Sequence, residues 1–230
     1  MESTQHPRLD VVDLTAPLTT DLWRYDEAFP AFESMPLTTR ATDGFEMSRL
    51  TLGTHMGTHS DSGSHLIPGG WTLDELGLGP YIGPVTVLAL GGRPLQEIEA
   101  ADLQLAAAEG IPPGDGVLLS TGWDANFGSA TYATHHPFLT EGAADWLVMH
   151  GVRIVAADLP GLMDPRIDLR PPTKPEATAD GRLLQARIPY VVGLVNVSDV
   201  DRRRVTLVAL PLRIEGADGA PVRAVALRDL

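Results

Sequence analysis

Three histidines and one aspartate stand within eleven residues of this chain, in the stretch His55-Met-Gly-Thr-His59-Ser-Asp61-Ser-Gly-Ser-His65. Imidazole nitrogens and carboxylate oxygens are the donor atoms that suit Zn²⁺ or Mn²⁺. The chain has no cysteine, which excludes a thiolate metal site and a cysteine nucleophile. The stretch therefore predicts a metal site, and the alternative is a polar loop whose histidines only satisfy hydrogen bonds.

The spacing of these residues limits the backbone that could bring them to one ion. His55 and His59 would share one face of a helix, but Asp61 would lie about 240° around the helix from His55. A straight strand places the side chains on one side, yet it would separate His55 from Asp61 by about 20 Å, far more than two ligand bonds of about 2 Å. We therefore predict an extended segment that bends, with Gly57 and Gly63 adopting the backbone angles of the bend.

The motif His55-x-Gly57-Thr58-His59-x-Asp61-x-x-x-His65 resembles the H-x-G-T-H-x-D-x-P-x-H signature of the cyclase-like metal-dependent hydrolases. This family includes bacterial kynurenine formamidase, isatin hydrolase and several cyclases of aromatic polyketide pathways. The resemblance extends along most of the chain, including Gly122-Trp123 and the turn that begins at Asp158. Gly63 departs from the motif, because the family usually has proline there. The resemblance implies a swivelling β/α, barrel-like fold.

The resemblance also implies that His55, His59 and Asp61 bind one divalent metal, Zn²⁺ or Mn²⁺. Hydrolases of the family commonly complete a second metal position with a histidine and a glutamate, which align here with Asp180 and Val192. Valine cannot bind a metal, whereas Asp180 could, so Asp180 is a candidate further ligand. We therefore expect one firmly held metal that keeps coordination positions open for water or substrate.

His65 lies outside this ligand set and is the candidate general acid and base, because the unperturbed pKa of histidine lies near neutral pH. The alternative roles of His65 are a further metal ligand and a hydrogen-bond donor to one. His135 and His136 could also contribute ligands, and simple solvent exposure is the alternative for these adjacent histidines.

Two enzymatic reactions could use these residues. In the first, a metal activates water to attack an amide, formamide or lactam. In the second, the metal holds an enolate while His65 moves protons, and an intramolecular aldol reaction with dehydration closes a ring. We expect the second reaction, on a carbonyl-rich polyketide-type intermediate, because Val192 replaces the second-site glutamate and Gly63 and Gly161 replace the family's usual Pro and Ser. The hydrolase is the alternative, and a metal-stapled binding protein is the least favoured possibility.

Composition restricts the partners of the chain. The formal net charge of −13 argues against a nucleic acid or an anionic membrane, which would require a basic face. Residues 1–7 contain neither a basic region nor an apolar run, and no stretch approaches eighteen apolar residues, so we expect a cytoplasmic protein that acts on a small molecule. The family resemblance and the aromatic N-terminal segment favour a homo-oligomer, either a dimer or a tetramer.

Hydrophobic patterning predicts an α/β fold in a single domain, residues 1–230, with a mixed and largely buried β-sheet and flanking helices. Predicted strands cover residues 9–14, 45–52, 85–90, 117–121, 152–158 and 191–197, and a C-terminal β-hairpin covers 205–214 and 221–227 around Asp218-Gly219. Predicted helices cover residues 100–109 and 141–150, and a short helix begins at Thr72 and ends by Gly77 or Gly79.

For some segments the sequence also predicts burial, strand pairing or a loop. Residues 45–52 alternate apolar and polar side chains, the pattern of a half-buried strand. The helix over 141–150 lies between two buried strands, which implies that they pair in parallel through a right-handed crossover. Residues 15–42 are expected to form a loop or lid whose aromatic side chains line a pocket or pack in the core, and residues 170–180 an exposed loop.

Overall fold

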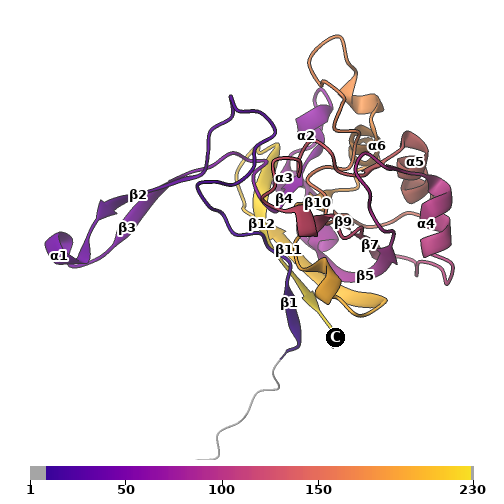
Figure 1. Cartoon of the computed structure of the whole chain (residues 1–230), viewed down its shortest axis with the longest axis horizontal. Helices are drawn as coiled ribbons and strands as arrows, with labels where there is room; N and C mark the ends of the chain where they lie inside the picture. Colours follow the sequence, from indigo (N-terminus) through magenta and orange to yellow (C-terminus); the bar gives the residue numbers. More distant parts are fainter. Residues whose placement is uncertain (1–8, 229–230) are drawn as a thin grey trace, which may run out of the picture.

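One mixed β-sheet organises the computed structural model of the chain, which describes residues 9–228 (Figure 1). Across this sheet the strands follow the order β1 (Val11–Asp13), β12 (Gly219–Leu227), β11 (Arg204–Pro211), β5 (Ile82–Ala89), β7 (Gly116–Ser120), β9 (Val155–Ala157), β10 (Tyr190–Val192) and β4 (His59–Asp61). β4 pairs with β12 as well as with β10, so the seven strands from β12 to β4 form a closed sheet. The predicted α/β fold with a barrel-like mixed sheet is confirmed. Residues 1–7, on which the expected cellular location partly depends, lie outside the described residues.

Three successive crossovers carry the larger helices to one face of the sheet. β5, β7, β9 and β10 pair in parallel, and their connections contain α4 (Ala100–Ala106), α5 (Glu141–Met149) and α6 (Ala179–Gln185). Because the strand order advances in one direction, right-handed crossovers place these helices on the same face, where Figure 1 shows them together. The predicted parallel pairing around α5 and the predicted hairpin of β11 and β12 are both confirmed.

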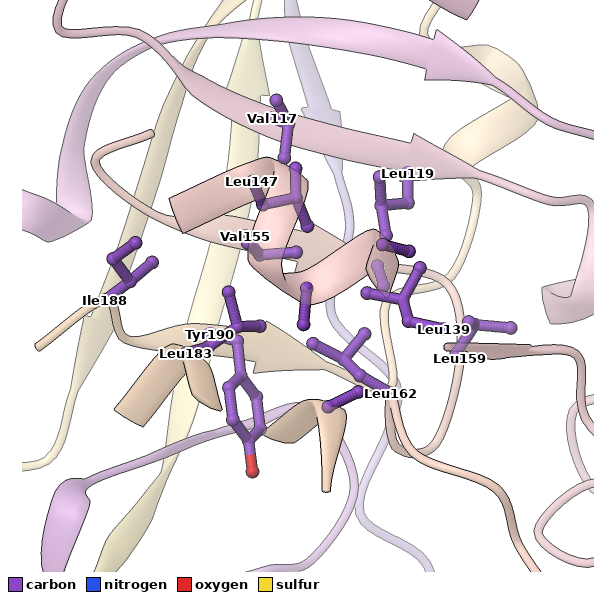
Figure 2. Close-up of a cluster of buried hydrophobic side chains, with 14 of the residues drawn as sticks. Val117, Leu119, Leu139, Leu147, Val155, Leu159, Leu162, Leu183, Ile188 and Tyr190 are labelled. Carbon is purple, nitrogen blue, oxygen red and sulfur yellow. The ribbon is translucent and has the colours of Figure 1, made fainter. Parts of the chain in front are cut away.

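Alternate residues of the parallel strands enter two separate hydrophobic clusters. In β7, Val117 and Leu119 pack with the helices, whereas Leu118 belongs to the cluster inside the closed sheet. Figure 2 shows the helix-side cluster, in which Val117 and Val155 lie near Leu147 of α5. The inner cluster includes small residues, which suit the restricted space there: Ala156, Ala209, Ala220, Ala224 and Ala226. Burial on both faces explains why these strands are continuously apolar in sequence.

Short elements complete the fold. The short helices are α2 (Gly63–Leu66), α3 (Leu73–Leu76), η1 (Gly79–Tyr81), η2 (Trp123–Asn126), η3 (Pro175–Ala177) and η4 (Val197–Asp199), and the short strands β6 (Glu97–Ile98) and β8 (Phe138–Leu139) pair in parallel. The predicted capping box at the start of α3 is present between Thr72 and Glu75. Over residues 9–228, every helix is too short or too polar to cross a lipid bilayer.

Some boundaries differ from the sequence predictions. β9 and β10 contain three residues each, fewer than the segments 152–158 and 191–197. Residues beyond β10, such as Leu194 and Val197 of η4, are as buried as the strand, so an apolar run predicts burial but not strand length. The exposed loop expected over 170–180 contains η3, and its last two residues are buried in α6.

The segment comprising β2 (Glu33–Thr38), α1 (Arg40–Asp43) and β3 (Met47–Thr51) forms an arm that projects from the rest of the chain (Figure 1). β2 and β3 pair only with each other in the described structure, and no residue of this arm is buried. The prediction of a half-buried strand over 45–52 is therefore wrong in its burial, because nothing in the described chain covers either face of β3. The loop expected over 15–42 is correct only as far as residue 32.

Leu147 and Met149 of α5 provide a matched test of the helix-side core. Leu147 is fully buried and Met149 is 77% exposed. We expect Leu147→Ala to lower the free energy of unfolding by about 2–5 kcal/mol, because it removes apolar contacts and leaves a cavity. Met149→Ala should change it by less than about 0.5 kcal/mol. Urea unfolding followed by circular dichroism measures both values, and equal losses in the two variants would contradict this description of the core.

Candidate metal centre

The histidine motif bends at Gly57 and then enters β4. Gly57 has a φ of +63°, a left-handed conformation that glycine adopts without steric cost, which confirms its predicted role. The hydroxyl of Thr58 holds the bend, since it donates to the carbonyl of Gly193 at 2.7 Å and accepts from the amide of Ala16 at 2.8 Å. The prediction for Gly63 is wrong: this residue lies in α2, where a Cβ would come within 2.6 Å of the Trp71 ring.

Three donor atoms converge where β4 lies between β10 and β12. Oδ1 of Asp61 is 2.9 Å from Nδ1 of His55 and 3.3 Å from Nε2 of His59. Nδ1–H of His59 donates to the carbonyl of Gly57 at 2.9 Å, so Nε2 carries the lone pair. A lone pair and a carboxylate oxygen repel each other at this distance unless a proton or a metal ion lies between them. The three donor atoms lie within 4.8 Å of one another, which fits one metal ion with ligand bonds of about 2 Å.

Asp61 is buried, and neighbouring groups compensate its charge. Burial raises the pKa of this carboxyl, but His55 and His59 outweigh burial and hold the pKa of Asp61 well below its usual range. Tyr190 lies opposite Asp61 in the pairing of β10 with β4, and its hydroxyl donates to Oδ2 of Asp61 at 2.7 Å. Oδ1 therefore faces the imidazoles while Oδ2 is held by Tyr190.

His55 lies between two carboxylates. Its Nδ1 faces Asp61, and its Nε2 is 3.0 Å from Oδ2 of Asp218. Burial lowers the pKa of His55, but these two carboxylates outweigh burial and raise it to about 10. Asp218 is absent from the residues that the sequence predicts for the site. The pair Asp218-Gly219 is typical of a hairpin turn, and only the fold brings that turn to His55.

His65 occupies α2, beside the three-donor group rather than within it. Its Nε2 is 3.9 Å from Oδ2 of Asp61, and its ring centroid lies 3.9 Å from that of His55. The His65 side chain is 28% exposed, compared with 17% for His55 and 2% for His59. Burial lowers the pKa of His65 below its ordinary value, so the ring is neutral at pH 7 and can accept a proton. His55, His65 and Asp218 also form a second group of donors within 4.8 Å of one another.

Asp180 lies near Asp61 but outside both groups of donors. Its Oδ2 is 3.3 Å from the hydroxyl of Tyr190 that donates to Asp61. Burial and the nearby Asp61 raise the pKa of Asp180 to about 7, and its Oδ1 is buried with no hydrogen-bond partner among residues 9–228. His135 is exposed, and burial lowers the pKa of His136 to about 4. Within the described chain neither of these two histidines joins a group of donors.

The segment before the arm places aromatic rings over the site. The Tyr25 ring lies edge-on to His59 with 6.5 Å between centroids, and its hydroxyl donates to the carbonyl of Pro160. Trp23 packs against Tyr25 and Tyr132, with centroid distances of 4.8 and 5.2 Å. Nε1 of Trp23 and the hydroxyl of Tyr132 are buried without a hydrogen-bond partner in the described structure. Because buried polar groups are normally paired, these two groups could bind a polar substrate.

The sequence is similar to that of known hydrolases along most of its length. A profile of the family described as putative cyclase matches residues 12–163. Kynurenine formamidase from Bacillus cytotoxicus is 28% identical over 216 residues, which cover 93% of this chain and 95% of the relative. Kynurenine formamidase from Geobacillus thermodenitrificans is 32% identical over 184 residues, which cover 80% of each chain.

Solved structures agree with this similarity. An isatin hydrolase bound to the product analogue thioisatinate matches with a TM-score of 0.82 and 25% sequence identity, covering 95% of this chain and 92% of the other. A protein described as a potential metal-dependent hydrolase with cyclase activity matches with a TM-score of 0.75 and 26% identity, covering 97% of this chain and 100% of the other. The fold is therefore shared over nearly the whole chain.

Metal analysis tests the three-donor group. We expect the purified protein to carry about one Zn²⁺ or Mn²⁺ per chain, because two imidazoles and a carboxylate suit these ions. His59→Ala and Asp61→Ala each remove a donor and should lose the metal, whereas His135→Ala, at an exposed position, should keep it. Mass spectrometry of dialysed protein gives the stoichiometry, and retention of the metal in both donor variants would contradict the assignment.

Proposed function

The chain belongs to the putative cyclase family, and we propose that it is a metal-dependent hydrolase that opens an amide, formamide or lactam bond of a small molecule. The observation that carries this proposal is the convergence of Nδ1 of His55, Nε2 of His59 and Oδ1 of Asp61. A neutral histidine, His65, lies beside them on the more open side of the site. Similarity to two kynurenine formamidases and to an isatin hydrolase supports hydrolysis.

Ring closure of a polyketide-type intermediate, the reaction that the sequence favours, has less support. That expectation depends mainly on Val192, which replaces a glutamate of the family's second metal position. Val192 is buried in the helix-side core, so its presence leaves the donors of His55, His59 and Asp61 unchanged. Ring closure stays as a second candidate because one structural neighbour is described as having cyclase activity.

Each residue of the site has a defined task in the proposed hydrolysis. When bound, Zn²⁺ or Mn²⁺ supplies Lewis-acid activation of the substrate carbonyl and of water. His55, His59 and Asp61 would hold the metal, and the hydroxyl of Tyr190 keeps Asp61 in its orientation. His65 accepts a proton from the attacking water and returns it to the departing nitrogen.

Two neighbouring features refine this proposal. Trp23 and Tyr25 provide an aromatic surface over the site, and Nε1 of Trp23 and the Tyr132 hydroxyl offer two unpaired donors, which suits an aryl substrate with polar substituents. Asp180 is the candidate further ligand, because its Oδ1 is buried without a partner. Since the pKa of Asp180 is raised to about 7, a cation bound there would displace a proton.

Direct assays distinguish the two reactions. Metal-loaded protein is incubated separately with N-formylkynurenine, isatin and a poly-β-ketone, and each mixture is followed by absorbance and mass. We expect loss of formate from the first or gain of water by the second, and no ring-closed product from the third. His65→Ala should retain fold and metal but lose about 10²- to 10⁴-fold in rate, the usual contribution of general acid and base catalysis. Ring closure without any hydrolysis would contradict the proposal.

The projecting arm supports assembly of the chain with a second copy of itself. Exposed apolar side chains occur on both strands and on the turn, namely Met35, Leu37, Phe45, Met47 and Leu50. A two-stranded hairpin is at best marginally stable by itself, so these residues require a cover. The arm comprises residues 33–51, close to the roughly 20–30 residues that each partner contributes to a stable interface.

The same chain also offers an apolar surface for a partner's arm. Ile82 of β5 is exposed and pairs with Val208 of β11. Leu210, in the same strand, and Leu212, just after it, are also exposed. In a two-fold symmetric dimer the arm of each copy could cover such a surface on the other. We therefore propose a homo-oligomer, at least a dimer, in which the arm supplies the contact.

Light scattering at micromolar concentration tests this assembly. Wild-type protein is expected to be at least dimeric, and the double variant Leu37→Ser/Leu50→Ser should be monomeric because it removes apolar area from both strands of the arm. Leu105→Ser changes a leucine of α4 that is 77% exposed and should assemble like the wild type. A monomeric wild type, or a double variant that keeps the wild-type mass, would contradict the role of the arm.

A further inference from the structure

We propose that Asp218 is a positioning residue that fixes the tautomer and the ring orientation of His55 for metal binding, an inference that rests on the proposed metal site. A neutral imidazole carries one lone pair, so only one ring nitrogen of His55 can bind an ion. Nδ1 is the nitrogen that faces the donor oxygen of Asp61, at 2.9 Å. Nε2 must then carry the proton, and this proton requires an acceptor.

Asp218 provides that acceptor. Its Oδ2 lies 3.0 Å from Nε2 of His55, within normal hydrogen-bond distance. A carboxylate that accepts from the second nitrogen of a metal-binding histidine is a common way to fix the ring and to strengthen its lone pair. The pair therefore leaves Nδ1 of His55 available beside Nε2 of His59.

The opposite assignment, in which Asp218 itself binds a metal together with His55 and His65, fits the geometry less well. It would require Nε2 of His55 to lose its proton and Nδ1 to carry one toward Asp61. Nε2 of His59 would then face Oδ1 of Asp61 at 3.3 Å with no cation between them. If the metal binds through Nδ1 of His55, it faces both the lone pair of this nitrogen and the lone pair of Nε2 of His59.

The fold holds Asp218 at this position through the same pairing that closes the sheet. The carbonyl of Asp218 accepts hydrogen bonds from the amide and the hydroxyl of Ser62, both at 2.9 Å. The next residue, Gly219, lies opposite Asp61 in the pairing of β12 with β4. A Cβ at Gly219 would lie 2.5 Å from Cε1 of His55, so the His55 ring lies directly against the backbone of this turn. Asp218 and Gly219 thus fix the ring by charge and by close contact.

Metal affinity measures this role apart from catalysis. Competition with a chromophoric chelator gives the dissociation constant of Zn²⁺ for the full-length wild type and for three variants. Asp218→Ala should bind about 10- to 100-fold more weakly, the usual effect of removing such a partner. Asp218→Asn should lose less, because its amide oxygen still accepts from Nε2–H. Glu215→Ala, in the exposed part of the same turn, should match the wild type.

Nitrogen-15 NMR of histidine-labelled, zinc-loaded protein provides a second measurement. We expect His55 to show a metal-bound Nδ1 and a protonated Nε2 in the wild type and in Asp218→Asn, and loss of this single form in Asp218→Ala. An unchanged zinc affinity and an unchanged His55 tautomer in Asp218→Ala would overturn the role of Asp218 but not the metal site. Two zinc ions per wild-type chain, one of them lost in Asp218→Ala, would overturn it by making Asp218 a ligand. A wild type without zinc affinity would overturn the metal site as well.

Discussion

Compensation of one buried carboxylate is the constraint on which this structure depends. Moving an isolated charge from water into a protein interior costs roughly several kcal/mol unless partners offset it. Asp61 is 5% exposed, and its partners come from separate parts of the chain: the imidazoles of the bent motif and the Tyr190 hydroxyl of β10. β4, which carries Asp61, is also the strand that joins β10 to β12. The pairing that closes the sheet therefore also assembles the site.

The same arrangement gives the three histidines of the motif different properties. His55 lies between two carboxylates, which raise its pKa to about 10, whereas burial lowers the pKa of His59 and of His65. His59 is the most buried and has its tautomer fixed by a backbone carbonyl, as a ligand requires. His65 is the most exposed of the three, and its ring nitrogens lie 3.9 Å from the nearest oxygens of Asp61 and Asp218, which suits a residue that exchanges protons with a substrate. In the proposed hydrolysis, position in the fold thus separates the histidines that would bind the metal from the histidine that would transfer protons.

The sequence predicts those parts of the site that are close together in the chain. His55, His59 and Asp61 are predicted from a dense His and Asp segment and its resemblance to the family motif, and a short segment needs only one bend to bring them together. Tyr190 and Asp218 are not identified, since they follow Asp61 and His55 by 129 and 163 residues and only strand pairing brings them near. Burial is predicted correctly where apolar runs are continuous, as in β7. The alternation of apolar and polar residues in β3 predicts that one face of the strand is buried. It does not predict whether this chain or another molecule buries that face.

The central claim is that one metal is held at Oδ1 of Asp61. Anomalous diffraction from a crystal of the metal-loaded protein tests this claim most directly. We predict a single strong peak about 2.0–2.2 Å from Nδ1 of His55, Nε2 of His59 and Oδ1 of Asp61, the bond lengths that zinc makes to these atoms. A peak bound instead through Nε2 of His55 together with His65, or a metal-loaded crystal with no peak beside Asp61, would contradict it.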